Sequence, residues 1–240
     1  AADYEKIRVQ HAGKKGPKLI PLAAARANAF TTEWAHYTPA VPTFIGRREF
    51  RNVDLAELAA LIDWGPFFQT WELSGPYPAI LDDALVGEAA RNVFAEGQAM
   101  LKRIVDGRWL TASGVVALLP AHSVGDDIVC YADAARTKVA LTWNNLRQQN
   151  ERPPGKPNTC LADFVAPRDS GVADFVGAFA VTAGLGIEKK LAEFAAKHDD
   201  YGAIMLKALA DRLAEAFAEW LHRKVRRERW GYPRDATLDA

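Results

Sequence analysis

Ile62–Trp71 (IDWGPFFQTW) is the stretch around which we expect the fold to be organised. Its four aromatic rings fall within eight residues, and each ring hides a large apolar area when it packs. We therefore expect most of these rings to be buried. Asp63 stands in front of them, and its carboxylate needs hydrogen-bond donors, water or a charged ligand. Two interpretations are open: Asp63 caps the turn locally, as acids beside Gly and Pro often do, or it meets a ligand.

The residues before this stretch predict a helix that ends at it. Asp54 can cap a helix whose apolar residues, spaced for one face, are Leu55, Leu58, Leu61 and Ile62. Gly65 and Pro66 end it. Asp63 is then expected near the C-terminus of the helix, where the helix dipole disfavours a negative charge. This position favours an external cationic or hydrogen-bonding partner for Asp63.

Composition indicates an ordinary soluble globular protein. Of the 240 residues, 49% are hydrophobic and 25% are charged, and 30 Lys and Arg balance 30 Asp and Glu. This balance argues against nucleic acid or a membrane as a partner. No apolar run has the length of a bilayer span, and the start of the chain is not a signal peptide. Cys130 and Cys160 are expected to be small buried residues in a reducing compartment, so we expect a cytoplasmic protein.

The first residues differ from the rest of the chain. Ala1–His11 reads as the end of a helix that began upstream, and a basic linker, residues 13–18, follows it. Leu22–Asn28 predicts a short helix. Aromatic residues become denser from Phe30 onward. We therefore place a domain boundary there, with residues 1–29 as the end of a preceding module plus linker and residues 30–240 as the domain itself.

The order of the remaining segments predicts an α+β domain. Val41–Ile45 reads as an extended segment followed by a basic turn. Strands are expected at Gly114–Pro120, Ile128–Tyr131, Lys138–Trp143 and Asp174–Gly184, the last as the central strand. The tight connections between the first three favour antiparallel pairing. Helices are expected at Asp82–Val105, with Leu85 on the buried side, at Ile187–Lys197, and from Tyr201 onward, with Ile204 buried.

No sequence motif identifies a catalytic side chain or a metal ligand. Two Glu-x-x-His pairs occur, Glu33 with His36 and Glu219 with His222, but a di-iron bundle needs two more inward acids. The pair Asp126-Asp127 is expected to be solvated in a turn or to cap the start of a strand, rather than to hold a metal. Arg147 is expected to be a surface charge.

Three further acids have an expected place in the final helix. Asp199 and Asp200 are predicted to cap its N-terminus and to favour its positive end. Glu215 lies between small residues, Ala214 and Ala216, which leave room for a partner. On spacing alone, however, Glu215 is a residue of a solvated helix face.

Seven segments in order resemble one known family: IDWGPFFQTWELSGPYP, VGDDIVCYAD, NNLRQQ, CLADFVAP, GAFAVTAG, HDDYGAIMLKALADRLAEAFAEWLH and WGY. Together they are similar to the activation domain of cobalamin-dependent methionine synthase, from about Phe30 to about Tyr232. Residues 1–29 resemble the end of the preceding cobalamin-binding module and its linker. The resemblance implies a single α+β domain with a bent, mostly antiparallel sheet flanked by long helices.

The resemblance also implies a function. In the family, this domain binds S-adenosylmethionine and presents its methyl group to cob(II)alamin, while a flavodoxin-type partner supplies an electron. The whole enzyme, a methyltransferase, methylates homocysteine to methionine. Cobalamin is bound by the neighbouring module of the same polypeptide, and zinc belongs only to a remote module.

Site residues follow from the matching motifs. Asp63 matches an aspartate that contacts the ligand, and we expect it to accept a hydrogen bond from the amino group of S-adenosylmethionine. Glu215 matches a family acid near the same site, and Trp64 and Phe67 are expected to shape the wall beside them. A sulfonium cation suits acids near aromatic rings. Candidates for contact with the cobalamin module are Asp199, Asp200 and Asp211.

One family motif is missing from the sequence. The ligand-binding pattern R-x-x-x-G-Y-P-A-C-P follows the W-G-Y segment in the family, whereas this chain stops at Ala240. We therefore expect a domain truncated at its C-terminus that binds S-adenosylmethionine weakly or not at all when alone. The alternative is a non-catalytic docking module for the cobalamin domain or flavodoxin.

Overall fold

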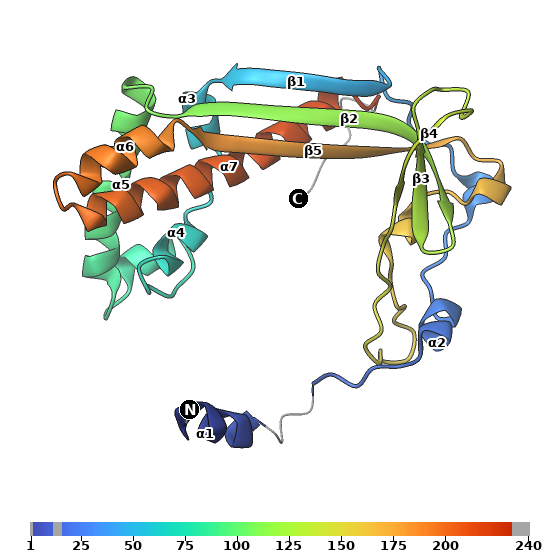
Figure 1. Ribbon diagram of the computed structural model, residues 1–240, viewed down its shortest axis with the longest axis horizontal. Coiled ribbons are helices and arrows are strands. Elements are labelled where there is room, and N and C mark those ends of the chain that lie inside the picture. Colours follow the sequence, from blue (N-terminus) through green and yellow to red (C-terminus); the bar gives the residue numbers. More distant parts are fainter. Residues whose placement is uncertain (1, 12–15, 232–240) are drawn as a thin grey trace. The chain divides into compact units, whose positions relative to one another are not determined.

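The computed structural model describes residues 2–11 and 16–231 and has the predicted α+β class (Figure 1). Its α-helices are α1 (Ala2–His11), α2 (Leu22–Ala27), α3 (Leu55–Ala59), α4 (Gly65–Gln69), α5 (Gly87–Asp106), α6 (Ile187–Ala195) and α7 (Asp200–Glu228). Its strands are β1 (Gly46–Val53), β2 (Thr111–Val124), β3 (Asp127–Tyr131), β4 (Val139–Trp143) and β5 (Asp174–Leu185). They form one mostly antiparallel sheet of order β1-β2-β3-β4, in which β5 also pairs with β2.

The described residues divide into two compact units. Residues up to 41 together with 118–176 form the first, here called the hairpin unit because it contains β3 and β4. Residues 42–117 together with those from 177 onward form the second, here called the helical unit because it contains α3 to α7. The division falls within β2 and β5, which each begin in one unit and end in the other.

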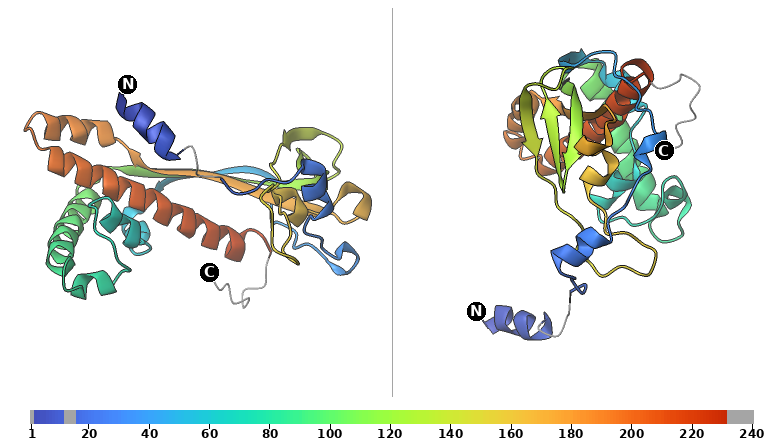
Figure 2. Two further views of the ribbon diagram at one scale, coloured as in Figure 1. Left: turned by 90° about the horizontal axis from the view of Figure 1, so that it is seen from below. Right: turned by 90° about the vertical axis from the view of Figure 1, so that its right-hand side faces the viewer.

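The helical unit is built on α7, which packs against α3, α4, α5 and α6. Asp199 caps its N-terminus as predicted, because the carboxylate accepts a hydrogen bond of 2.7 Å from the Gly202 N–H. An apolar stripe of α7 is buried: Met205, Leu206, Leu209, Leu213, Ala216, Phe217, Leu221 and Val225. Ile204, expected in this stripe, is instead 45% exposed. Seen from below, α7 runs across the sheet strands of this unit (Figure 2).

The aromatic stretch is buried in the helical unit, as predicted. Phe67 and Phe68 are fully buried, and Trp64 lies edge-on to Phe67 and to Phe94 of α5, with ring centroids 5.1 Å and 4.9 Å apart. Gly97 of α5 lets the Phe67 ring approach, since a Cβ there would lie 2.6 Å from its Cζ. These rings therefore join α4 to α5.

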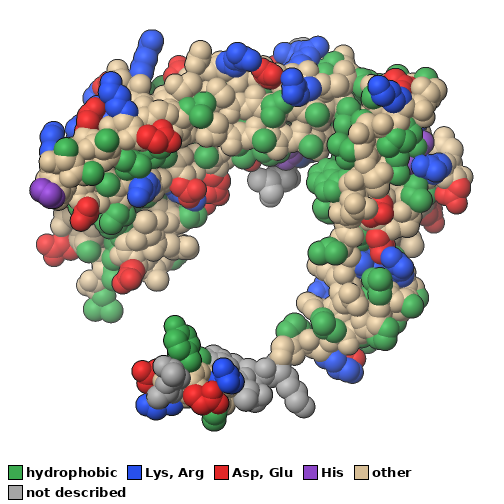
Figure 3. Space-filling model, in the orientation of Figure 1, with side chains coloured by type: hydrophobic (Ala, Val, Ile, Leu, Met, Phe, Trp, Pro, Cys, Tyr) green, Lys and Arg blue, Asp and Glu red, His purple; other side chains and the backbone are tan. Residues whose placement is uncertain are grey.

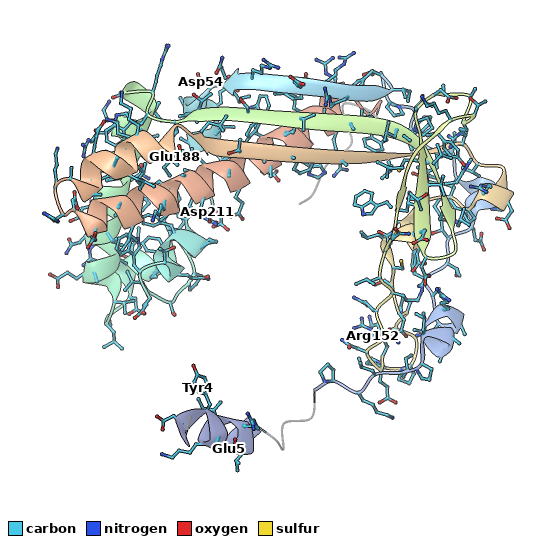
Figure 4. All side chains as sticks on the ribbon, viewed as in Figure 1. Tyr4, Glu5, Asp54, Arg152, Glu188 and Asp211 are labelled. Carbon is cyan, nitrogen blue, oxygen red and sulfur yellow. The ribbon has the colours of Figure 1, made fainter. Side chains whose placement is uncertain are left out.

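The helix before this stretch is shorter than predicted. Asp54 caps it as expected, by accepting a hydrogen bond of 2.9 Å from Ala56 N–H, but α3 ends at Ala59 and α4 begins at Gly65. Asp63 thus lies just before the N-terminus of a helix, not at a C-terminus. The prediction that a helix dipole opposes its charge was wrong. Figure 4 labels Asp54 where β1 leads into α3.

β1 was missed, because its sequence GRREFRNV is too charged to show the alternation of a buried strand. The residues expected as a basic turn pair with β2 instead, and Phe50 packs edge-on to Trp220 of α7 at a centroid distance of 6.0 Å. β2 also takes the central place that was predicted for Asp174–Gly184, since it pairs with β1, β3 and β5. Pairing to β2, not hydrophobic pattern, therefore defines β1.

The hairpin unit contains the antiparallel pairs that the sequence predicts. Ala121 of β2 pairs with Cys130 of β3, and Cys130 pairs with Leu141 of β4. Both cysteines are buried as expected, in a small core of Ala121, Ile128, Cys130, Cys160, Ala162 and Val165. The segment from Lys18 to Asn28 hydrogen-bonds to residues 149–158 of the polar loop, for example through Ile20 N–H to Gln149 O at 2.9 Å. The domain boundary at residue 30 stays a prediction.

One further boundary differs from prediction. α5 begins at Gly87, not at Asp82, and Leu85 before it is 94% exposed. Asp83 ends the preceding turn, where its carboxylate accepts hydrogen bonds from the N–H groups of Leu85 and Val86. Among the described residues, no helix combines the length and apolar character needed to cross a bilayer.

Candidate functional site

A hollow of about 450 Å³ opens in the helical unit beside α7. Three elements contribute: the segment between α3 and α4, strand β5, and the second half of α7. Its lining residues are Leu61, Asp63, Phe179, Glu215, Ala216, Ala218, Glu219 and His222. The hollow therefore brings together the two acids that the sequence predicts as ligand contacts, Asp63 and Glu215.

Asp63 is exposed at the edge of this hollow and is held by its own turn. Its Oδ1 accepts a hydrogen bond of 2.9 Å from the Gly65 N–H. A carboxylate has about four acceptor positions, so this bond leaves most of them for other donors. Behind it, Trp64 and Phe67 are buried and anchor the turn. Asp63 is thus a fixed, exposed negative charge with the capacity to accept further hydrogen bonds.

Two further acids and a histidine lie on α7. Glu215, Glu219 and His222 follow one another at spacings of four and three residues, which places them on one face of the helix. Glu215 is ion-paired with Arg212 and Glu219 with Arg223, one turn away along the same helix. Their side chains are 54% and 42% exposed. Figure 4 labels Asp211 on the same helix, and Figure 3 shows acidic side chains interspersed with basic ones over the helices of this unit.

Small and aromatic residues complete the walls. Ala216 and Ala218 come from α7, and Phe179 from β5 presents a side chain that is 47% exposed. The hollow therefore combines three carboxylates with an exposed aromatic ring. Carboxylates and aromatic faces both attract cations, so this arrangement suits a positively charged ligand.

The comparisons with known proteins identify the family. The family model described as vitamin B12 dependent methionine synthase, activation domain, matches residues 54–240. The crystal structure of the MetH reactivation domain bound to AdoHcy is similar to this chain, with a TM-score of 0.85 and 49% sequence identity. The similarity covers 93% of this chain and 68% of that chain. This chain belongs to the methionine synthase activation domain family. The resemblance seen in the sequence is thereby confirmed. The domain belongs to a cobalamin-dependent methionine synthase, which is a methyltransferase.

In this activation domain, the two residues predicted to form the wall of the site, Trp64 and Phe67, do not lie beside Asp63 and Glu215 in the hollow. Trp64 and Phe67 are in the core and are not among the residues that line the hollow. Their contribution to the site is indirect, through the position of the Asp63 turn. Two of the predicted contacts with the cobalamin module already have partners within this domain. The Asp199 carboxylate caps α7, and Asp211, which is 72% exposed, forms an ion pair of 2.6 Å with Arg212.

Among the lining residues of the activation domain that were not predicted as ligand contacts, three have an aromatic or titratable side chain: Phe179, Glu219 and His222. Glu219 and His222 were noted only as a Glu-x-x-His pair. Their spacing from Glu215 along one helix face was the signal that could have found them. Phe179 carries no such signal, because only the packing of β5 against α7 brings it to the hollow.

The sequence raised the possibility of a metal at the two Glu-x-x-His pairs and at Asp126-Asp127, all of which lie in the part of the chain that the structure describes. There, no group of three or more His, Cys, Asp or Glu side chains is arranged to hold an ion. Asp126, expected to be solvated, is buried against Arg147, which was expected at the surface. Arg147 donates to Asp126 Oδ1 at 2.7 Å and to Asp163 Oδ1 at 2.7 Å, and its side chain is only 3% exposed.

This buried ion-pair network lies in the hairpin unit and borders a separate hollow of about 910 Å³. Burial alone would raise the pKa of Asp126, but hydrogen bonds from Arg26 and Arg147 outweigh burial and leave that pKa lowered. The pKa of Arg147 is raised, chiefly by its hydrogen bonds to Asp163, so the guanidinium stays charged. The network therefore has a structural role, in joining the turn between β2 and β3, the polar loop and the Cys160 turn.

Proposed function

We propose that the hollow lined by Asp63 and Glu215 binds S-adenosylmethionine and presents its methyl group to the cobalamin of a neighbouring module. One observation carries this proposal: two acids far apart in the sequence line one hollow together with an exposed aromatic ring. The crystal structure of the MetH reactivation domain bound to AdoHcy supports it, since AdoHcy differs from S-adenosylmethionine only in lacking the transferred methyl group and its charge.

The lining residues fit this ligand chemically. S-adenosylmethionine carries a sulfonium cation and an ammonium group, and three carboxylates border the hollow. Asp63 accepts a hydrogen bond from the ammonium group, because its oxygens keep acceptor positions beside the bond from Gly65. Glu215 lines the same hollow from α7 and adds negative charge. The alanines of α7 leave the room that the ligand needs.

The partners follow from the family. When bound by its own module, cobalamin supplies the cobalt that accepts the methyl group, and a flavodoxin-type protein supplies the electron. Asp199, Asp200 and Asp211 are the proposed contacts with the cobalamin module. Of these, Asp211 has a side chain that is 72% exposed. We also propose residues 30–240 as the activation domain and residues 1–29 as the end of the preceding module.

Calorimetric titration of the natural polypeptide that carries this chain tests the proposal. Asp63→Asn keeps the size of the side chain and removes its charge, so the affinity for S-adenosylmethionine should fall about 10- to 100-fold, as for a lost charge-assisted hydrogen bond. Glu215→Gln should weaken binding in the same direction. The matched control is Glu188→Gln, an acid in the first turn of α6, which should change the affinity less than 2-fold.

Two outcomes would contradict the proposal. If Asp63→Asn binds as tightly as the wild type, Asp63 does not contact the ligand. If the wild-type polypeptide binds no S-adenosylmethionine but still associates with the cobalamin module, the docking alternative is the better interpretation.

A further inference from the structure

Phe179 faces α7 from the middle of β5. Alternate residues of a strand point to the same face of a sheet, so Phe179, Val181 and Ala183 share one face. Val181 marks this face as the one toward α7. A Cβ on Gly114 of β2 would lie 3.0 Å from Val181 Cγ1 and 2.9 Å from Cζ of Phe217, which belongs to α7. Ala183 on the same face is fully buried.

Phe179 is exposed although it lies on the covered face of the sheet. Its side chain is 47% exposed, whereas other rings of the helical unit, such as Phe67 and Phe217, are fully buried. Two of the α7 residues that line the same hollow, Ala216 and Ala218, have side chains too short to cover much of a ring. An aromatic ring in such a place loses the burial that normally stabilises it. A ligand in the hollow would restore that burial.

The groups around Phe179 decide which ligand suits the ring. Asp63, Glu215 and Glu219 line the same hollow, and they favour a positive charge. The face of a phenyl ring is the negative end of its quadrupole and also attracts a cation. A neutral apolar ligand would cover the ring but would remove the Asp63 carboxylate from water without offering it a donor beyond the Gly65 N–H. The ring and the acids therefore favour the same ligand, a cation with apolar substituents.

We propose that Phe179 is a specificity-determining residue, whose ring contacts the sulfonium centre of S-adenosylmethionine and favours it over the uncharged thioether AdoHcy. This inference rests on the function proposed above. Phe179 discriminates because transfer of the methyl group removes the positive charge from sulfur, so that the product loses the cation–π attraction that the donor had. The acids hold the ligand in place, and the ring distinguishes the charged donor from the spent one.

Three ligands and two variants test this role in the natural polypeptide that carries the chain. The ligands are S-adenosylmethionine, AdoHcy and sinefungin, which carries an ammonium group where the donor has its sulfonium. Phe179→Leu keeps an apolar side chain without a ring. It should weaken the two charged ligands about 2- to 30-fold, the range expected for a lost cation–π contact, and change AdoHcy less than 2-fold. Phe179→Trp should keep or increase the preference for charged ligands.

Control measurements separate this effect from a fold defect. Phe164→Leu removes another exposed ring, 56% exposed and in the hairpin unit, and should leave all three affinities unchanged. Thermal melting of Phe179→Leu should stay close to the wild type, because the ring is already half exposed.

Each remaining outcome decides against the inference. If Phe179→Leu weakens AdoHcy as much as the charged ligands, the ring is only an apolar wall. If no affinity changes, the ring does not contact the ligand at all. If Phe179→Leu leaves the charge preference intact while Asp63→Asn abolishes binding, the proposed function stands without this role. A wild-type polypeptide that binds none of the three ligands would overturn both.

Discussion

Replacing Arg147 tests whether the buried ion-pair network stabilises the hairpin unit. The guanidinium donates five hydrogen bonds of 2.7–2.9 Å: two to Asp126, two to Asp163 and one to Asn158 O. Arg147→Met fills similar space without donors. Asp126 would keep its bond from Arg26, but Asp163 would lose both of its bonds to Arg147 while its side chain is only 7% exposed.

The expected loss is large, because removing one partner leaves a buried charge uncompensated. We expect Arg147→Met to lower the free energy of unfolding by about 3–5 kcal/mol. Arg26→Met is the matched control: its side chain is 57% exposed, so the loss should be below about 1 kcal/mol. Removing the second charge as well, in Arg147→Met with Asp163→Asn, should recover part of the stability.

The two cysteines provide a measurement specific to this unit. Cys130 and Cys160 are the only cysteines of the chain, both lie in the hairpin unit, and they are 1% and 3% exposed. Their reaction with a thiol reagent in increasing urea therefore reports the opening of this unit, even if the helical unit unfolds separately. Arg147→Met should shift the labelling to lower urea. A labelling curve that coincides with that of Arg26→Met would refute the reasoning.

The same network predicts a dependence on pH. The folded-state pKa of Asp126 is lowered, because hydrogen bonds from Arg26 and Arg147 outweigh the opposite effect of burial. A lowered pKa means that the stabilisation is complete above the unfolded value of about 3.9 and is lost as the pH falls through the folded value. The difference in the free energy of unfolding between the wild type and Arg147→Met should therefore become smaller below about pH 4.

Three other predictions concern the helical unit. Gly114→Ala should destabilise by about 1–3 kcal/mol in urea unfolding, because the new Cβ would lie 2.9 Å from Phe217 Cζ, whereas Gly184→Ala, with open space at the Cβ, should be neutral within about 0.5 kcal/mol. Asp199→Ala should cost about 1 kcal/mol, since it removes the N-cap of α7, and an unchanged melting temperature would contradict this role. Burial, together with the hydrogen bond to Glu96, raises the pKa of Tyr201 to about 12, so ultraviolet titration should find one tyrosine that ionises late, and Glu96→Gln should bring it closer to 10. Because the raised value favours the protonated folded form, the contribution of Tyr201 to stability should be lost as the pH rises from about 10 through 12.

Local chemistry made several features predictable. Asp54 and Asp199 were recognised as helix caps because capping depends on a side chain and the backbone two or three residues away. The β3–β4 hairpin followed from two short apolar runs with a tight connection, and the burial of Phe67 and Phe68 followed from their size. These features depend on neighbours in the sequence, so the sequence carries them.

The site needed contacts between distant segments. Asp63 and Glu215 were predicted only through the family resemblance, and nothing in their spacing brings them to one hollow. Phe179 became a wall residue because β5 packs on α7 opposite alanines. Arg147 looked like a surface charge because its partners, Asp126 and Asp163, lie 21 and 16 residues away in the chain.

The amino-acid sequence by itself determined the α+β class, the helix caps and the aromatic core of the α4 turn, since propensity, capping and side-chain size act over a few residues. Tertiary structure alone decided that the charged segment Gly46–Val53 is a strand, that Arg147 is buried, and which side chains face Asp63. The physical reason is that strand pairing, burial of an ion pair and the lining of a hollow each depend on surfaces contributed by remote parts of the chain.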